Sequence, residues 1–69
     1  MRAIIKLTPS NYKLNEQTIS LHTSFGADIT VPVDKVSAQS DTILVPVEYF
    51  REKNLLPSDV VDGYCGITE

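Results

Sequence analysis

The sequence predicts an α+β fold that is mostly β: a small barrel-like or swapped-hairpin sheet of about five short strands, with one short helix at about residues 46–54. Two observations lead to this fold class. Apolar residues recur at every second position in several short segments, which is typical of half-buried strands. Only one segment has the end signals of a helix. A chain of 69 residues is expected to form a single small domain over residues 1–69.

The first expected strand covers residues 3–7, where apolar and polar side chains alternate until Pro9. Residues 8–17 are rich in Pro, Ser and Asn, which favour turns. The clearest alternation in the chain lies in residues 18–25. The core face expected for this second strand consists of Ile19, Leu21 and Phe25.

Gly26 follows this strand directly and predicts a tight connection to a third strand at residues 29–33. Because Pro32 has no N–H to donate to a ladder, we expect that strand to lie at an edge or to contain a bulge. The polar residues 34–41 are expected to form a loop. Two further strands are expected at residues 42–47 and 60–67.

The expected helix begins at Pro46 or Val47, since a Pro at the first helical position loses no intrahelical hydrogen bond. Asn54 suits a left-handed C-cap, and Pro57 prevents continuation. The apolar stripe of the helix would be Val47 and Phe50. A helix of about two turns must be packed by the neighbouring strands.

Residues 29–36 and 43–50, "ITVPVDKV" and "ILVPVEYF", share Ile, Val, Pro, Val and an acidic residue in the same order. Two interpretations stay open. The pair is either a true repeat, which would indicate a pseudo-symmetric barrel, or a chance match between two strands that end near a Pro.

Few groups for catalysis or metal binding are present. With one Cys the chain forms no internal disulfide, and one Cys with one His does not make a structural zinc site. We expect His22 to be exposed on the polar face of its strand and Cys65 to be a small packed residue. The sequence therefore predicts no enzyme, no catalytic residue, no cofactor and no metal. Because a small core lacking these stabilisers is marginal, we expect a homodimer.

The net charge of −3 is unevenly distributed. Residues 1–27 hold three cations and one acidic residue, whereas residues 28–69 hold three cations and eight acidic residues. This acidity disfavours DNA as a partner, although a dimer could gather its cations in one patch. No apolar run has the length of a secretion signal or a membrane span, so we expect a cytoplasmic protein without a membrane partner.

The segment "TILVPVEYFREKNLLPSDVV" carries a strand, a Pro, a short helix with an Arg, a Leu, a turn with an Asp, and a Val-rich strand. In this order it resembles the AbrB/MazE (SpoVT-AbrB) swapped-hairpin domain, as a partial match over about residues 34–61. The matching residues are Ile43, Val45, Pro46, Arg51, Leu55, Leu56, Pro57, Ser58, Asp59, Val60 and Val61. The resemblance implies an interlocked dimer that presents basic residues to DNA; here these would be Lys35, Arg51 and Lys53.

Two functions follow. The first is a small non-enzymatic binding protein, of phage or mobile-element type, that acts through an interface with a host or cognate protein. The alternative is an AbrB/MazE-like dimeric DNA-binding regulator or antitoxin. The candidate binding residues are Lys35, Tyr49, Arg51 and Lys53. For Arg51 a phosphate contact or a clamp on a carboxylate competes with a surface pair to Glu48 or Asp59.

Overall fold

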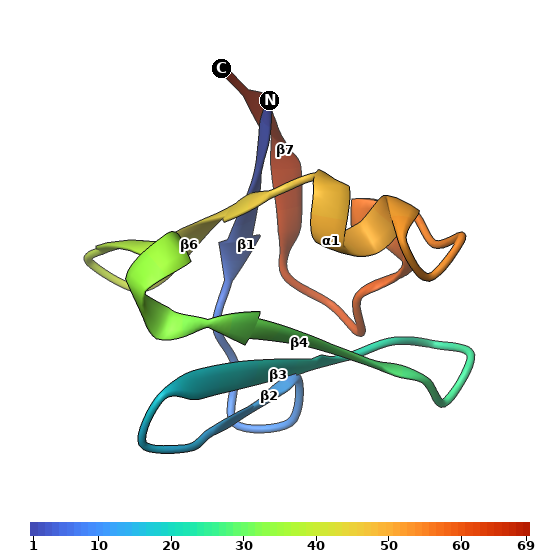
Figure 1. The fold of residues 1–69 in the computed structure, drawn as a ribbon, viewed down its shortest axis with the longest axis horizontal. Coiled ribbons are helices and arrows are strands. Elements are labelled where there is room, and N and C mark those ends of the chain that lie inside the picture. The colour runs from blue at the N-terminus through green and yellow to red at the C-terminus, as the bar shows by residue number, and fades with distance from the viewer.

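The computed structural model describes all residues, 1–69, and contains seven strands, one α-helix and two 3₁₀ turns. In chain order the elements are β1 (Arg2–Lys6), β2 (Tyr12–Leu14), β3 (Thr18–His22), β4 (Asp28–Pro32), η1 (Val33–Lys35), β5 (Ser37–Gln39), β6 (Thr42–Pro46), α1 (Glu48–Arg51), η2 (Pro57–Asp59) and β7 (Tyr64–Thr68). Figure 1 shows β1, β6 and β7 above the layer formed by β2, β3 and β4, with both chain ends at the top.

The strands form two antiparallel sheets, of four strands in the order β5-β6-β1-β7 and of three strands in the order β2-β3-β4. The predicted α+β, mostly β class is confirmed. The sheets do not close into a barrel, because β5, β7, β2 and β4 each have a strand on one side only. The predicted number of strands was too low by two, since β2 and β5 lie in segments expected to be turn and loop.

The core lies between the two sheets and is closed on one side by α1. The inward-facing residues of β1, β3, β4 and β6 supply most of it; burial alternates along the first three strands, as their sequences predict, whereas three successive residues of β6 are buried. Phe50 of α1 is fully buried among them. The complete apolar cluster consists of Ala3, Ile5, Ile19, Leu21, Ile29, Val31, Ile43, Val45, Val47, Phe50 and Val60.

The hairpin predicted after Gly26 is confirmed, with Leu21 opposite Ile29 and Thr18 opposite Pro32. Pro32 ends an edge strand, also as predicted. Phe25, however, was wrongly placed in the core: its side chain is 71% exposed. The strand ends before Phe25, because the N–H of Thr23 donates to the carbonyl of Ala27 and the chain turns between these two residues. The alternation of the sequence therefore does not predict burial beyond Thr23.

The α-helix covers Glu48–Arg51, which is shorter than the predicted residues 46–54. Pro46 is still the last residue of β6, and the chain beyond Arg51 continues in turns. The predicted left-handed cap at Asn54 is confirmed by its φ of 58°. The two similar segments, residues 29–36 and 43–50, both run from a strand through a Pro into a helical turn, η1 in one case and α1 in the other.

Asn11 joins the two sheets and is a buried polar residue with no exposed surface. Its side-chain amide donates to the carbonyl oxygens of Lys6 (3.0 Å) and Asp62 (3.5 Å), and its side-chain oxygen accepts the N–H of Thr8 (2.9 Å). Its backbone carbonyl also accepts the N–H of His22. One side chain therefore connects the end of β1, the start of β2 and the bend before β7.

Gly63 lies against this junction. Its carbonyl accepts the N–H of Lys6 at 2.7 Å, and its φ of +82° is left-handed. A Cβ at this position would overlap the carbonyl oxygen of Lys6 and lie 2.9 Å from the amide nitrogen of Asn11. Both the backbone conformation and the close approach thus require Gly here.

We predict that Asn11→Ala lowers the free energy of unfolding by about 1–2 kcal/mol, because it leaves three partly buried backbone groups, of Lys6, Thr8 and Asp62, without their partner. The matched control is Asn15→Ala, which removes an exposed amide with a single 3.5 Å contact to Thr18 and should change stability by less than about 0.5 kcal/mol. Urea denaturation of both variants measures the difference. Equal losses would contradict the role of Asn11.

We also predict that Gly63→Ala is more damaging than Gly26→Ala. Gly26 has a similar φ of +79°, but a Cβ there meets no atom within 4 Å. Gly26→Ala therefore isolates the cost of the left-handed backbone, about 1–2 kcal/mol. Gly63→Ala adds a steric overlap with backbone, worth about 1–3 kcal/mol more. Thermal denaturation of the two variants should show this order, and the reverse order would exclude the close approach.

Candidate functional site

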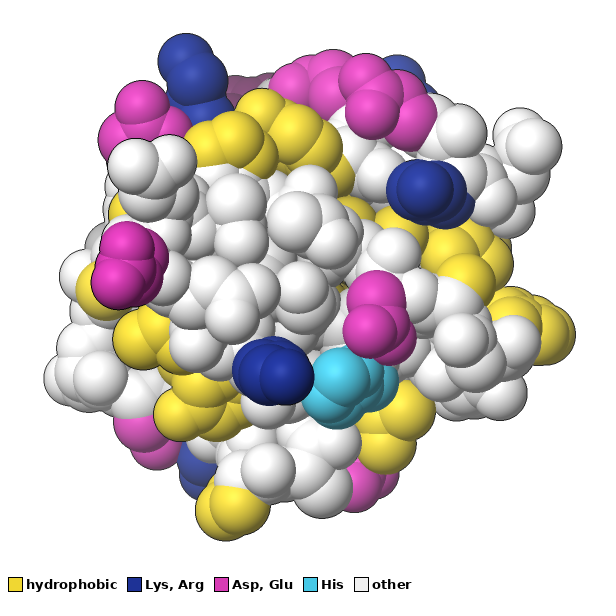
Figure 2. Space-filling view, turned by 60° about the horizontal axis from the view of Figure 1, so that its bottom comes forward, with side chains coloured by type: hydrophobic (Ala, Val, Ile, Leu, Met, Phe, Trp, Pro, Cys, Tyr) yellow, Lys and Arg dark blue, Asp and Glu magenta, His cyan; other side chains and the backbone are white.

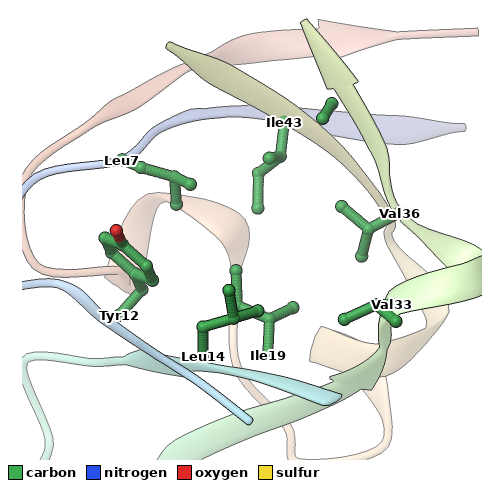
Figure 3. A pocket seen from close by; sticks show the side chains of 8 residues that line it. Leu7, Tyr12, Leu14, Ile19, Val33, Val36 and Ile43 are labelled. Atoms are coloured by element: carbon green, nitrogen blue, oxygen red, sulfur yellow. The ribbon is translucent and has the colours of Figure 1, made fainter. Parts of the chain in front are cut away.

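An open apolar cavity of about 250 Å³ lies between the two sheets, beside β2, η1 and β5. All of its lining residues are hydrophobic, namely Leu7, Tyr12, Leu14, Ile19, Val33, Val36, Ala38 and Ile43. Figure 3 shows these side chains arranged around one common space, with Leu7 and Ile43 across from Leu14 and Ile19. The strands supply them by alternation, since Tyr12 and Leu14 of β2 lie opposite Leu21 and Ile19 of β3.

The cavity has a buried floor and an exposed rim. Ile19 and Ile43 on the floor belong to the core cluster. On the rim, Leu14 is 62% exposed and Val33 is 38% exposed. Contiguous exposed apolar surface, unlike single exposed apolar residues, marks contact surfaces, and here the rim side chains adjoin the apolar cavity.

The size and chemistry of the cavity restrict what it can hold. Small-molecule sites commonly measure roughly 300–1,000 Å³ and present several convergent polar groups. This cavity is smaller, and the only polar side-chain atom on its lining residues is the Tyr12 hydroxyl. It therefore suits one or two apolar side chains of a partner better than a polar cofactor.

Val33 also lines a second, polar hollow together with Glu16, Gln17, Pro32 and Asp34. Neither carboxylate takes part in either of the two ion pairs of the structure, Lys6–Asp41 and His22–Asp28. Val33 thus borders both hollows, and the polar hollow, here termed the lip, carries two negative charges without ion-pair partners beside the apolar cavity.

The structure separates the candidate binding residues into two groups. Tyr49, Arg51 and Lys53 lie in or just after α1, whereas Lys35 ends η1. Figure 1 places α1 and the green turn of η1 on opposite sides of the molecule. Lys35, Arg51 and Lys53 are exposed, and Tyr49 is half-buried against the core.

The expected surface pair of Arg51 is absent: Arg51 forms no ion pair with Glu48 or Asp59. The Asp59 carboxylate instead accepts the backbone N–H of Leu56 at 2.9 Å, at the start of η2. The helix charges are therefore solvated separately, and the alternatives for Arg51 that involve a partner molecule stay predictions.

The side chains of His22 and Cys65 form no hydrogen bond with each other. Nδ1 of His22 lies 2.9 Å from the carboxylate of its cross-strand neighbour Asp28, and the Cys65 thiol lies 3.3 Å from the carbonyl oxygen of Gly63. Cys65 was wrongly expected to be packed: it is exposed, because it lies on the edge strand β7.

Figure 2 views the molecule from the side of the three-stranded sheet. The single His lies there next to an acidic side chain, backbone and side chains that are neither hydrophobic nor charged fill most of the centre, and hydrophobic side chains lie around the margin. No group of three or more His, Cys, Asp or Glu side chains could hold a metal ion. None of the helices combines the length and apolar character that a bilayer crossing requires.

Comparison of this chain with protein-family models, with curated proteins and with solved structures finds no match. The site therefore has to be interpreted from its own geometry.

The sequence-based reasoning missed this cavity, although two signals for it are present. Tyr12 and Leu14 alternate with Lys13 inside the turn-rich segment, and Val33 and Val36 are apolar residues beside a polar loop. Each signal is too short to predict a strand by itself. Only the packing of the two sheets brings these residues together.

Proposed function

We propose that this protein is a small non-enzymatic binding protein that acts through a protein–protein interface centred on the apolar cavity. One observation carries the proposal: an entirely apolar hollow with Leu14 and Val33 exposed at its rim. Interfaces are commonly anchored by a few apolar side chains that fill such hollows and exclude water. The partner is a host or cognate protein that supplies the inserted side chain.

The proposal predicts that Leu14→Ser removes partner binding while Phe25→Ser does not. Both residues are exposed and apolar, but Phe25 lies in the turn between β3 and β4 and does not line the cavity. Immobilised wild type and Phe25→Ser should retain the same protein from a lysate of the producing cells. Leu14→Ser should retain at least about tenfold less of that protein.

One further measurement makes this experiment decisive. Urea denaturation checks that both variants stay within about 0.5 kcal/mol of the wild type, as exposed substitutions should. A partner that binds all three proteins equally, or no reproducible partner for the wild type, would exclude the cavity as the interface.

A second candidate function is an AbrB/MazE-like dimeric regulator that binds DNA. The observation in its favour is that Lys35, Arg51 and Lys53 are exposed and free of ion pairs within the chain. Because Lys35 lies apart from the other two in one chain, a homodimer would be needed to bring enough cations to one DNA duplex. The acidic net charge keeps this candidate second.

This candidate predicts that mixed duplex DNA is bound at low salt, with an affinity that falls as salt rises. Fluorescence anisotropy measures the binding. The triple variant Lys35→Gln, Arg51→Gln, Lys53→Gln should weaken it, whereas Lys6→Gln, which removes a cation already paired with Asp41, should not. Absence of binding, or a light-scattering mass near the 7.6 kDa of one chain, would contradict the regulator.

A further inference from the structure

The rim of the apolar cavity includes an unpaired sheet edge. β2 pairs only with β3, and its other side carries no strand. Two backbone hydrogen bonds flank β2: the carbonyl of Asn11 accepts the N–H of His22, and the N–H of Asn15 donates to the carbonyl of Thr18. Since bonded and non-bonded pairs alternate in an antiparallel ladder, the backbone N–H and C=O of Tyr12 and Leu14 point away from β3.

The same two residues present their side chains to the cavity. Tyr12 and Leu14 both line it, whereas Lys13 between them faces the other side of the sheet together with its neighbour Ser20. Across the cavity, Ala38 lies on β5, the edge strand of the other sheet. The opening is thus bordered by edge strands of both sheets (Figure 3).

We infer that the partner of this protein binds as an extended segment that adds a strand to the β2 edge, with apolar side chains at alternate positions entering the cavity and a Lys or Arg beside it. This inference rests on the proposed function and specifies its binding mode. An added strand places every second side chain on the cavity face, while its backbone bonds the free groups of Tyr12 and Leu14.

The charge of the lip supports a basic residue in the partner. Glu16 and Asp34 line the polar hollow that shares Val33 with the cavity, and neither has an ion-pair partner. A cation on the incoming segment would meet two carboxylates there, whereas an acidic segment would be repelled.

The same edge disfavours a second copy of this chain. Antiparallel pairing of two β2 strands through the free backbone groups of both Tyr12 and Leu14 would place Tyr12 of one copy opposite Leu14 of the other. Lys13 of one copy would then lie directly opposite Lys13 of the other. Like charges in directly opposed positions destabilise a strand pair. The edge therefore suits a strand from another protein.

A short synthetic peptide that alternates Val and Thr, with Lys at both ends, tests the binding mode by NMR titration of the full chain. We expect the Tyr12 and Leu14 amides to exchange with solvent about tenfold more slowly in the complex. The amide of Phe25, outside the site, serves as the internal reference and should not change.

Two isomeric peptides make the test specific for strand addition. One carries N-methyl groups on the Val amides and the other on the Thr amides. If the added strand is antiparallel, the Val amides form the bonds to β2, and the first peptide loses binding. If the added strand is parallel, the Thr amides form these bonds, and the second peptide loses binding. In either case one isomer loses binding and the other keeps it. Equal effects of the two isomers would overturn strand addition.

Glu16→Gln and Asp34→Asn should each weaken the Lys-bearing peptide about two- to fivefold and leave a peptide with Ser in place of Lys unaffected. Unchanged affinity of the Lys-bearing peptide would overturn the inference that the partner places a Lys or Arg at the lip. The proposed function and the binding mode can fail separately. Loss of the natural partner in Leu14→Ser supports the proposed function. If the two N-methylated peptides then bind alike, or the unmethylated peptide does not bind, strand addition at β2 is wrong while the proposed function stands. Concentration-dependent protection of Tyr12 and Leu14 in the free protein would instead assign the edge to a second copy.

Discussion

The buried amide of Asn11 is the constraint on which the arrangement of the two sheets depends. Its three side-chain hydrogen bonds reach Lys6, Thr8 and Asp62, so the end of β1, the turn after it and the entry to β7 are held at one point. A buried polar group satisfied in this way is costly to leave without its partners, and it therefore specifies one geometry. Its backbone carbonyl also starts the β2–β3 ladder. The positions of Tyr12 and Leu14 over the cavity consequently follow from Asn11, although Asn11 does not line the cavity itself.

The parts of the fold that the sequence predicted are those with a local cause. Alternation over about five residues suffices for β1, β3 and β4, and a short apolar run predicts β6. Pro46 with Asn54 delimits the helical segment, even though its α-helical part is shorter. β2 and β5 have three residues each, and most of their side chains are exposed. In strands this short any alternation is too brief to predict a strand, because their formation depends on pairing with the edge of a longer strand. The cavity is bordered by these two strands, so the site was missed together with them.

The candidate residues derived from the family resemblance have a different limitation. The resemblance concerns the order of elements: β6, α1 and η2 follow one another as it implies, but Val60 and Val61 form no strand, since the next strand, β7, begins at Tyr64. The basic residues that it singled out depend on how two chains or distant segments are arranged, which the order of elements does not determine. In one chain Lys35 lies apart from Arg51 and Lys53. Hydrophobic burial and the Asn11 junction set the fold, whereas the placement of solvated charges is left free.

An incompletely closed pair of sheets leaves four edges, and each differs in how open it is to another strand. Proteins commonly block edges with Pro, with bulges or by keeping strands short. Here β4 ends in Pro32, and β7 is irregular at its junction with β1, where the register shifts between Ile4 and Ile5. β2 has neither feature; it is short and carries Lys13 at its centre. A Lys in that position opposes pairing with an identical strand but not with a strand that places a neutral or acidic residue opposite it. The edge beside the cavity is thus protected against its own copy while it stays accessible to a different partner.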